Sequence, residues 1–144
     1  MEKQPQIPFA PKDFARCLNA TCPRSQNCLR RTAALQDTDE HLFLKVVNPL
    51  RYPKEGEECE LFRSTDKVRM AWGVTHLLDN VPYKEGSLLR NMIINHLGRS
   101  QYYRCFRKER PFSPQDQQTI RLLFRQRGIS EEPSFDYYTN EFNW

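Results

Sequence analysis

Helical hydrophobic periodicity runs through residues 87–128 in three successive stretches. In the first, apolar residues recur at helical spacing before a glycine stop: Leu88, Leu89, Met92, Ile93 and Leu97, then Gly98. We expect Ser100 to cap a second, short helix whose Tyr103 and Phe106 lie one turn apart and point inward. Two helices joined by the turn Gly98-Arg99-Ser100 are typical of a helix-turn-helix.

The third stretch begins at Ser113-Pro114, where serine caps a helix and proline occupies its first turn. Apolar residues give this helix one buried side before a glycine ends it: Ile120, Leu123 and Phe124, then Gly128.

Upstream, the pattern predicts a fourth helix over about 65–79, capped by Ser64 and carrying apolar residues that include Trp72. The run HLFLKVV at 41–47 is short and ends in β-branched residues, so it predicts a strand. Cys22-Pro23 can open a helix that includes Leu29, Ala33 and Leu35 and breaks near Asp37.

These elements predict an α+β fold that is mainly helical. An extended arm at 1–13 would precede a single domain at 14–144, which divides into a cysteine-rich lobe (14–63), a helical half (64–128) and an aromatic tail (129–144). A length of 144 residues suits one domain, and a hydrophobic fraction of 38% implies a modest core. The tail carries many aromatic residues, which we expect to fold back onto the domain.

The chain has no apolar run of membrane-spanning length, and its first residues lack the apolar stretch of a signal peptide. We therefore expect no membrane contact and a cytoplasmic protein. Five cysteines are an odd number, and in a reducing compartment metal ligation or free thiols are favoured over disulfides.

Three of these cysteines follow the pattern C-x4-C-x5-C, and a fourth lies about thirty residues later: Cys17, Cys22, Cys28 and Cys59. Thiolates hold Zn²⁺ or, as a less favoured alternative, an iron–sulfur cluster when their sulfurs converge. A helix starting at Pro23 would place Cys22 and Cys28 about 240° apart, so convergence requires a later start, near Gln26. Buried thiols and thiol redox chemistry stay open as alternatives.

Positive charge concentrates in residues 99–128, which hold eight basic and two acidic residues, whereas residues 129–144 hold four acids and no base. Arginine donates paired hydrogen bonds to phosphate and to guanine. We therefore identify a candidate nucleic-acid surface on the second helix: Arg99, Ser100, Gln101, Tyr102, Arg104, Arg107 and Lys108. A solvated helix face whose arginines pair with Glu109 or with the acidic tail is the alternative.

The pattern of Cys17, Cys22-Pro23, Cys28-Leu29-Arg30, Asn48-Pro49, and Cys59 followed by Phe62 resembles the first half of a small uncharacterised family. Gly98-Arg99-Ser100-Gln101-Tyr102-Tyr103-Arg104 and Phe135-Asp136-Tyr137 resemble its second half. The family is a domain of unknown function found mainly in gut Bacteroidota, and the resemblance covers residues 14–144. It implies no established activity. Residues 98–114 are also similar to phage-repressor-like helix-turn-helix proteins.

The three histidines lie on separate elements, and none forms a pattern that a hydrolase would need. We therefore favour a non-enzymatic accessory or regulatory protein. Its partner would be DNA or RNA, or a protein assembly bound to nucleic acid, and its cysteines would hold a structural metal. One alternative is a protein–protein adaptor that docks through the aromatic tail and the helix of Trp72. A second alternative is a thiol-redox or iron–sulfur protein.

Overall fold

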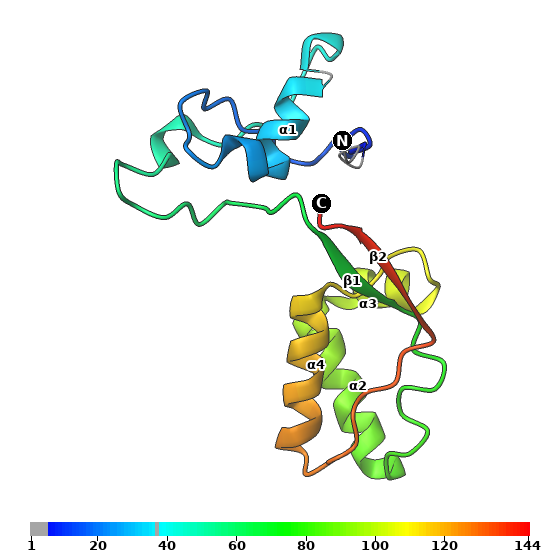
Figure 1. Ribbon diagram of the computed structural model, residues 1–144. Coiled ribbons are helices and arrows are strands. Elements are labelled where there is room, and N and C mark those ends of the chain that lie inside the picture. Colours follow the sequence, from blue (N-terminus) through cyan, green and yellow to red (C-terminus); the bar gives the residue numbers. More distant parts are fainter. Residues whose placement is uncertain (1–5, 37) are drawn as a thin grey trace, which may run out of the picture. The chain divides into compact units, whose positions relative to one another are not determined.

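The computed structural model describes residues 6–36 and 38–144, which form four α-helices and one two-stranded sheet (Figure 1). The fold is therefore α+β and mainly helical, as predicted. The chain divides into two compact units. Unit 1 comprises the described residues up to Asp66 together with Phe142–Trp144, and unit 2 is Lys67–Glu141. The prediction of one domain over 14–144, preceded by an arm, stays a prediction. Residues 1–5 of that arm and Asp37 lie outside the described residues.

Three of the helices belong to unit 2. They are α2 (Tyr83–Leu97), α3 (Arg99–Phe106) and α4 (Pro114–Gln126), which confirms the three helical stretches after residue 82. The link between α2 and α3 is Gly98 alone, shorter than the predicted three-residue turn. Its φ of 84° lies in the left-handed region, where glycine is favoured over other residues.

The early start of α3 changes which of its side chains face the core. Ser100 makes no capping hydrogen bond, so the predicted cap is wrong. Tyr102 and Cys105 are buried, whereas Phe106 is 55% exposed, so the inward face lies one residue before the predicted one. Residues i and i+3 lie on the same face of a helix, and the position at which the helix begins determines which such pair faces the core.

The start of α4 agrees with its prediction. Ser113 accepts a hydrogen bond from the Asp116 backbone N–H, and the Asp116 carboxylate accepts one from the Ser113 backbone N–H. Pro114 occupies the first turn. Together these contacts form a capping box, which satisfies two backbone N–H groups that a helix start otherwise leaves unpaired.

The sheet pairs two segments that are distant in sequence. Strands β1 (Lys67–Trp72) and β2 (Tyr137–Phe142) lie side by side and run in opposite directions (Figure 1). The predicted helix over 65–79 is therefore wrong. Ser64 instead closes a local turn with Asp66, and Gly73, with a φ of 79°, follows the strand. Long-range pairing overrides helical spacing here, because the backbone of Ala71 also exchanges two hydrogen bonds with Phe112.

Unit 2 has its own hydrophobic core, to which the helices, β1 and the tail all contribute. Phe135 of the tail packs on Phe112 with ring centroids 5.1 Å apart, so this part of the tail folds back as expected. Trp72 lies on β1, stacks on Tyr137 of β2 and donates a hydrogen bond to Thr139. It is therefore on a sheet and not on the helix that the adaptor alternative assumed.

Unit 1 contains one α-helix, α1 (Leu29–Gln36), among turns of 3-10 helix at Ser25–Asn27, Thr38–Glu40 and Pro49–Arg51. The predicted strand at 41–47 is wrong. Only Val46 forms an isolated bridge, with Arg16, and Leu42 and Phe43 are exposed. No longer partner strand lies beside this run among the described residues, and a strand needs one to satisfy its backbone. The small core is Ala10, Phe14, Leu29, Ala33 and Phe142, with Ile7 and Trp144 packed against it.

Candidate metal centre in the cysteine-rich unit

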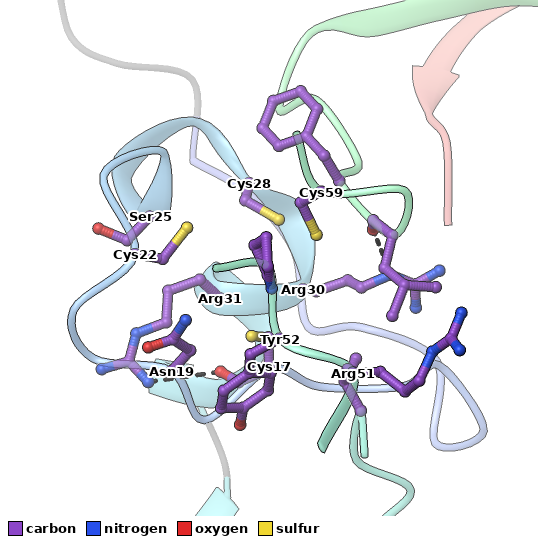
Figure 2. A pocket seen from close by; sticks show the side chains of 14 residues that line it. Cys17, Asn19, Cys22, Ser25, Cys28, Arg30, Arg31, Arg51, Tyr52 and Cys59 are labelled. Atoms are coloured by element: carbon purple, nitrogen blue, oxygen red, sulfur yellow. Dashed lines mark hydrogen bonds between the residues drawn. The ribbon is translucent and has the colours of Figure 1, made fainter. Parts of the chain in front are cut away.

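The four cysteines singled out in the sequence line one cavity of unit 1. Cys17, Cys22, Cys28 and Cys59 come from segments up to 42 residues apart (59 − 17), yet all border the same space of about 30 Å³. Figure 2 shows the sulfurs of Cys28 and Cys59 turned toward one another. The same view shows Cys22 and Cys17 beside that space.

Backbone hydrogen bonds bring these segments together. The Cys17 N–H donates to the carbonyl of Arg30 at 3.0 Å, which ties the first cysteine to α1. Cys28 forms an antiparallel bridge with Ser64, and the Leu29 N–H donates to the Arg63 carbonyl at 2.7 Å. These bonds hold the segment of Cys59 against the start of α1. These backbone hydrogen bonds place Cys17, Cys28 and the segment of Cys59 next to the start of α1.

Helix α1 begins late enough for Cys22 and Cys28 to converge, since the sequence spacing required a start near Gln26 or later. The helix begins at Leu29, and the chain before it takes a 3-10 turn at Ser25–Asn27. Cys22 and Cys28 therefore do not lie on the same α-helix, and the angular argument against their convergence does not apply.

All five cysteines are free thiols, and Cys28 is the buried one of the four around the cavity. Among residues 6–36 and 38–144, no three histidine, cysteine, aspartate or glutamate side chains lie close enough to hold a metal ion as they stand. Binding one ion would therefore require side-chain rotation that brings the sulfurs together. The cavity is large enough for an ion or a water molecule and too small for an organic ligand.

Three arginines share the cavity wall with the cysteines: Arg30, Arg31 and Arg51. Arg30 donates from Nε to the Leu61 carbonyl at 2.8 Å, and Arg31 donates from Nη1 to the Cys17 carbonyl at 3.4 Å. Four thiolates on a divalent ion carry a net charge of −2, and these guanidinium groups supply charge of the opposite sign.

The predicted nucleic-acid residues lie on or next to α3 in unit 2. Arg99, Ser100, Arg104, Arg107 and Lys108 are exposed, and Gln101 is half-buried. Tyr102 is only 6% exposed and packs in the core of unit 2, so the structure does not support its assignment to base stacking.

Several basic side chains of this region are paired with acids. Arg107 contacts Glu109 at 2.8 Å, and Lys108, which has a φ of 59° just after α3, contacts Asp136 at 3.3 Å. These pairs match the alternative in which the arginines and lysines balance Glu109 and the tail. Within the part of the chain that the structure describes, Arg99 and Arg104 form no salt bridge, although the charge of Arg104 contributes to lowering the pKa of Glu109.

The structure adds Arg90 of α2, which the sequence-based assignment missed. Its Nη2 donates to the Tyr103 hydroxyl at 3.3 Å, and Arg99 lies over the Tyr103 ring at 5.7 Å from its centroid. The helical pattern put Arg90 on the helix of residues 88–97, but nothing in the spacing indicated that it would meet Tyr103. Arg90 and Arg99 therefore both contact Tyr103, whereas Arg104 of the same helix contacts Gln101. These three arginines are hereafter called the α2–α3 arginine group.

No helix within the described residues has the length and apolar character needed to cross a membrane.

Comparison with known proteins gives one result. The family of unknown function DUF6078 matches residues 1–144. No curated protein and no solved structure matches this chain. The cysteines around the cavity and the α2–α3 arginine group both lie within the matched region. The chain belongs to the family of unknown function DUF6078.

Proposed function

We propose that unit 1 binds one Zn²⁺ through the thiolates of Cys17, Cys22, Cys28 and Cys59, and that the ion stabilises this unit. The observation that carries the proposal is the arrival of four cysteines, from separate backbone segments, at one small cavity. Zn²⁺ favours four thiolates in a tetrahedral, closed site when its role is structural.

The size of the cavity favours a single ion over an iron–sulfur cluster. A space of about 30 Å³ accommodates little more than one water molecule, whereas a cluster adds several iron and sulfide atoms. The construction of unit 1 supports the same choice. Its core has five buried apolar residues and its single α-helix has eight residues, so a metal would supply stability that hydrophobic burial does not.

Metal analysis of protein purified under reducing conditions tests the proposal, together with Co²⁺ substitution. We expect one zinc per chain, and cobalt-bound protein with the ligand-field and charge-transfer absorption of tetrahedral thiolate coordination. Cys22→Ser and Cys59→Ser should each lose that spectrum. Cys105→Ser is the matched control, because Cys105 is buried in unit 2. The proposal fails if zinc and cobalt do not bind, or if Cys105→Ser abolishes binding as the other two variants do.

We propose as a second candidate function that unit 2 contacts the phosphates of DNA or RNA. The observation in its favour is the α2–α3 arginine group, whose three guanidinium groups form no salt bridge within the described residues. Unpaired arginines on a helix surface donate to phosphate without first breaking an ion pair. Arg107 and Lys108, which the sequence placed in this surface, are already engaged by Glu109 and Asp136. The proposed contact surface is therefore Arg90, Arg99 and Arg104, beside Ser100.

A further inference from the structure

A second hollow in unit 1, which shares Arg30 with the cysteine cavity, combines aromatic and cationic walls. It has a volume of about 320 Å³, within the range of pockets that hold small organic ligands. The lining residues that carry the argument are Phe14, Trp144, Arg30, Lys45, Arg63 and Asp13. Three of these side chains are cations and one is an anion, so the hollow has an excess of positive charge.

The two arginines are held in place by carbonyl groups and not by carboxylates. Arg30 donates from Nη1 to the Ala15 carbonyl at 3.1 Å, and Arg63 donates from Nη1 to the Asn143 carbonyl at 2.9 Å. Neither forms an ion pair with an acid in the described ranges 6–36 and 38–144. Both guanidinium groups are thus fixed in position and keep donors that these bonds do not use.

The charges of these arginines repel each other. Burial, and then the charge of Arg30, lower the pKa of Arg63 below its ordinary value. Two like charges near one hollow destabilise each other, although Asp13 lines the same hollow and Cys28 acts on Arg63 in the opposite direction. An oxyanion between them would remove that repulsion and would accept hydrogen bonds from both, which is the arrangement that arginine pairs make with phosphate.

Aromatic rings form the other wall. Trp144 packs edge-on against Phe14, with centroids 5.1 Å apart, and lies 6.1 Å from the Phe142 ring. These contacts fix the indole, yet Trp144 is only half-buried and part of it borders the hollow. A fixed aromatic face beside phosphate-binding cations is the combination on which nucleobases stack.

We propose that this hollow binds a nucleotide, with the phosphate on Arg30, Arg63 and Lys45 and the base against Trp144. The nucleotide can be a free nucleoside monophosphate or one residue of a single strand, since both offer the same phosphate and base. The hollow shares Arg30 with the cysteine cavity and uses no residue of the α2–α3 arginine group. It places ligand recognition in unit 1, for which the sequence-based predictions were a structural metal or, as alternatives, thiol redox chemistry or an iron–sulfur cluster.

Calorimetric titration of the full chain with adenosine monophosphate, adenosine and inorganic phosphate tests this assignment. Adenosine monophosphate should bind more tightly than either part alone. Lys45→Gln and Arg63→Gln should each weaken its binding by about ten-fold or more, because each removes a charged phosphate contact. Lys45 is exposed, so its replacement leaves the fold intact even if Arg63→Gln does not fold. Arg51→Gln is the matched control, because Arg51 is outside this hollow and is paired with Glu60.

The aromatic wall and the ligand source need separate measurements. Trp144→Leu should weaken the binding of adenosine monophosphate and leave the binding of inorganic phosphate unchanged. This comparison separates the contribution of stacking from that of charge. Titration with a short single-stranded oligoadenylate identifies the source. If the oligoadenylate binds more tightly per site than adenosine monophosphate, and Arg63→Gln weakens its binding, the ligand is a strand. Otherwise the ligand is the free nucleotide.

The proposal is overturned if neither adenosine monophosphate nor the oligoadenylate binds at low salt. It is also overturned if inorganic phosphate binds as tightly as adenosine monophosphate, or if Arg51→Gln and Lys45→Gln weaken binding equally.

Discussion

Lys108 places its ammonium group 3.3 Å from the carboxylate of Asp136, and the pair lies against the bare Cα of Gly73. A Cβ added at Gly73 would lie 2.7 Å from Cγ of Asp136 and 2.8 Å from Cε of Lys108. The pair thus joins the end of α3, the end of β1 and the start of the tail within unit 2. This arrangement explains why Lys108 is better described as a structural residue than as a phosphate ligand.

Gly73→Ala should destabilise unit 2 by about 2–4 kcal/mol. The substitution places a side chain on a residue with a φ of 79°, and its Cβ would also clash with Asp136. Urea denaturation would measure the loss. Gly128→Ala is the matched control, since Gly128 has a φ of 75° and no atom within 4 Å of the added Cβ. It should cost only about 1 kcal/mol. Equal losses in the two variants would show that the packing of Lys108 and Asp136 on Gly73 does not matter.

The stability of unit 2 should fall in acid through the titration of Asp136. Burial alone would raise the pKa of Asp136, but the hydrogen bond from Thr75 and the contact with Lys108 outweigh it and hold that pKa below its ordinary value. A carboxylate with a depressed folded-state pKa contributes stability that is present above its unfolded pKa, about 3.9, and is lost as the pH falls further.

Asp136→Asn should therefore flatten the dependence of the unfolding free energy on pH below about pH 4. Thermal unfolding recorded between neutral pH and acid would show this. Thr75→Val should make the acid-induced loss smaller and end it at a higher pH, while its onset stays at the unfolded pKa, because one hydrogen bond that lowers the folded-state pKa is gone. If Asp136→Asn leaves the fall of the unfolding free energy in acid unchanged, other carboxylates cause that fall.

Ser113→Ala should destabilise the protein by about 1 kcal/mol, the usual cost of losing an N-cap. The Ser113 hydroxyl accepts from the Asp116 backbone N–H at 3.1 Å at the start of α4. Ser100→Ala tests the opposite case. Ser100 lies in the first turn of α3 and makes no capping hydrogen bond, so its replacement should leave the unfolding free energy almost unchanged. A larger loss for Ser100→Ala than for Ser113→Ala would contradict the observed helix starts.

Phosphate binding by unit 2 should depend on Arg104 and not on Arg107. In a salt series with mixed duplex DNA or structured RNA, Arg104→Gln should weaken binding and reduce the log–log salt slope by about 1. Arg107→Gln should change neither, because the Arg107 guanidinium already donates to both carboxylate oxygens of Glu109, at 2.8 and 3.3 Å. If Arg104→Gln and Arg107→Gln had identical effects, the proposed difference between Arg104 and Arg107 as phosphate contacts would be wrong. An absence of binding at low salt would exclude this candidate function.

Nucleotide binding in unit 1 should strengthen when Asp13 is neutralised. Asp13 is the one acidic residue among the described residues that line the hollow, and it is exposed. Asp13→Asn should raise the affinity for adenosine monophosphate roughly two- to five-fold, the size expected for one exposed charge. Glu60→Gln, which removes an acid elsewhere in unit 1, should have no effect. Weaker binding of Asp13→Asn would mean that the carboxylate contacts the ligand instead of repelling it.

Local signals predicted the helices around residues 83–126 well, because each had both periodicity and a stop or start residue. Gly98 and Ser113-Pro114 are such residues, and α2, α3 and α4 are bounded by them. The helices could be predicted because their contacts are close in sequence. The cysteine spacing predicted a metal site, which stays a prediction, and the four side chains border one cavity although Cys59 is distant in sequence.

The failures involve contacts that are distant in sequence. Residues 67–72 have a helical pattern, yet they pair with the tail and with Phe112. Lys108 and Asp136 meet across 28 positions (136 − 108), so the charge run around residue 104 did not show which cations would be neutralised. The nucleotide-sized hollow draws its wall from Phe14, Arg30, Arg63 and Trp144, and no local motif connects those positions.

The return of the chain to unit 1 at Phe142 has a consequence for biosynthesis. Unit 2 is continuous in sequence, so it can fold as soon as residues 67–141 have left the ribosome. Unit 1 is interrupted by unit 2, and its core lacks Phe142 and Trp144 until residues 142–144 have been made. Its earlier residues therefore stay incompletely packed while the whole of unit 2 is translated. The part of unit 1 that precedes Lys67 is thus expected to settle after unit 2, although it is made before it.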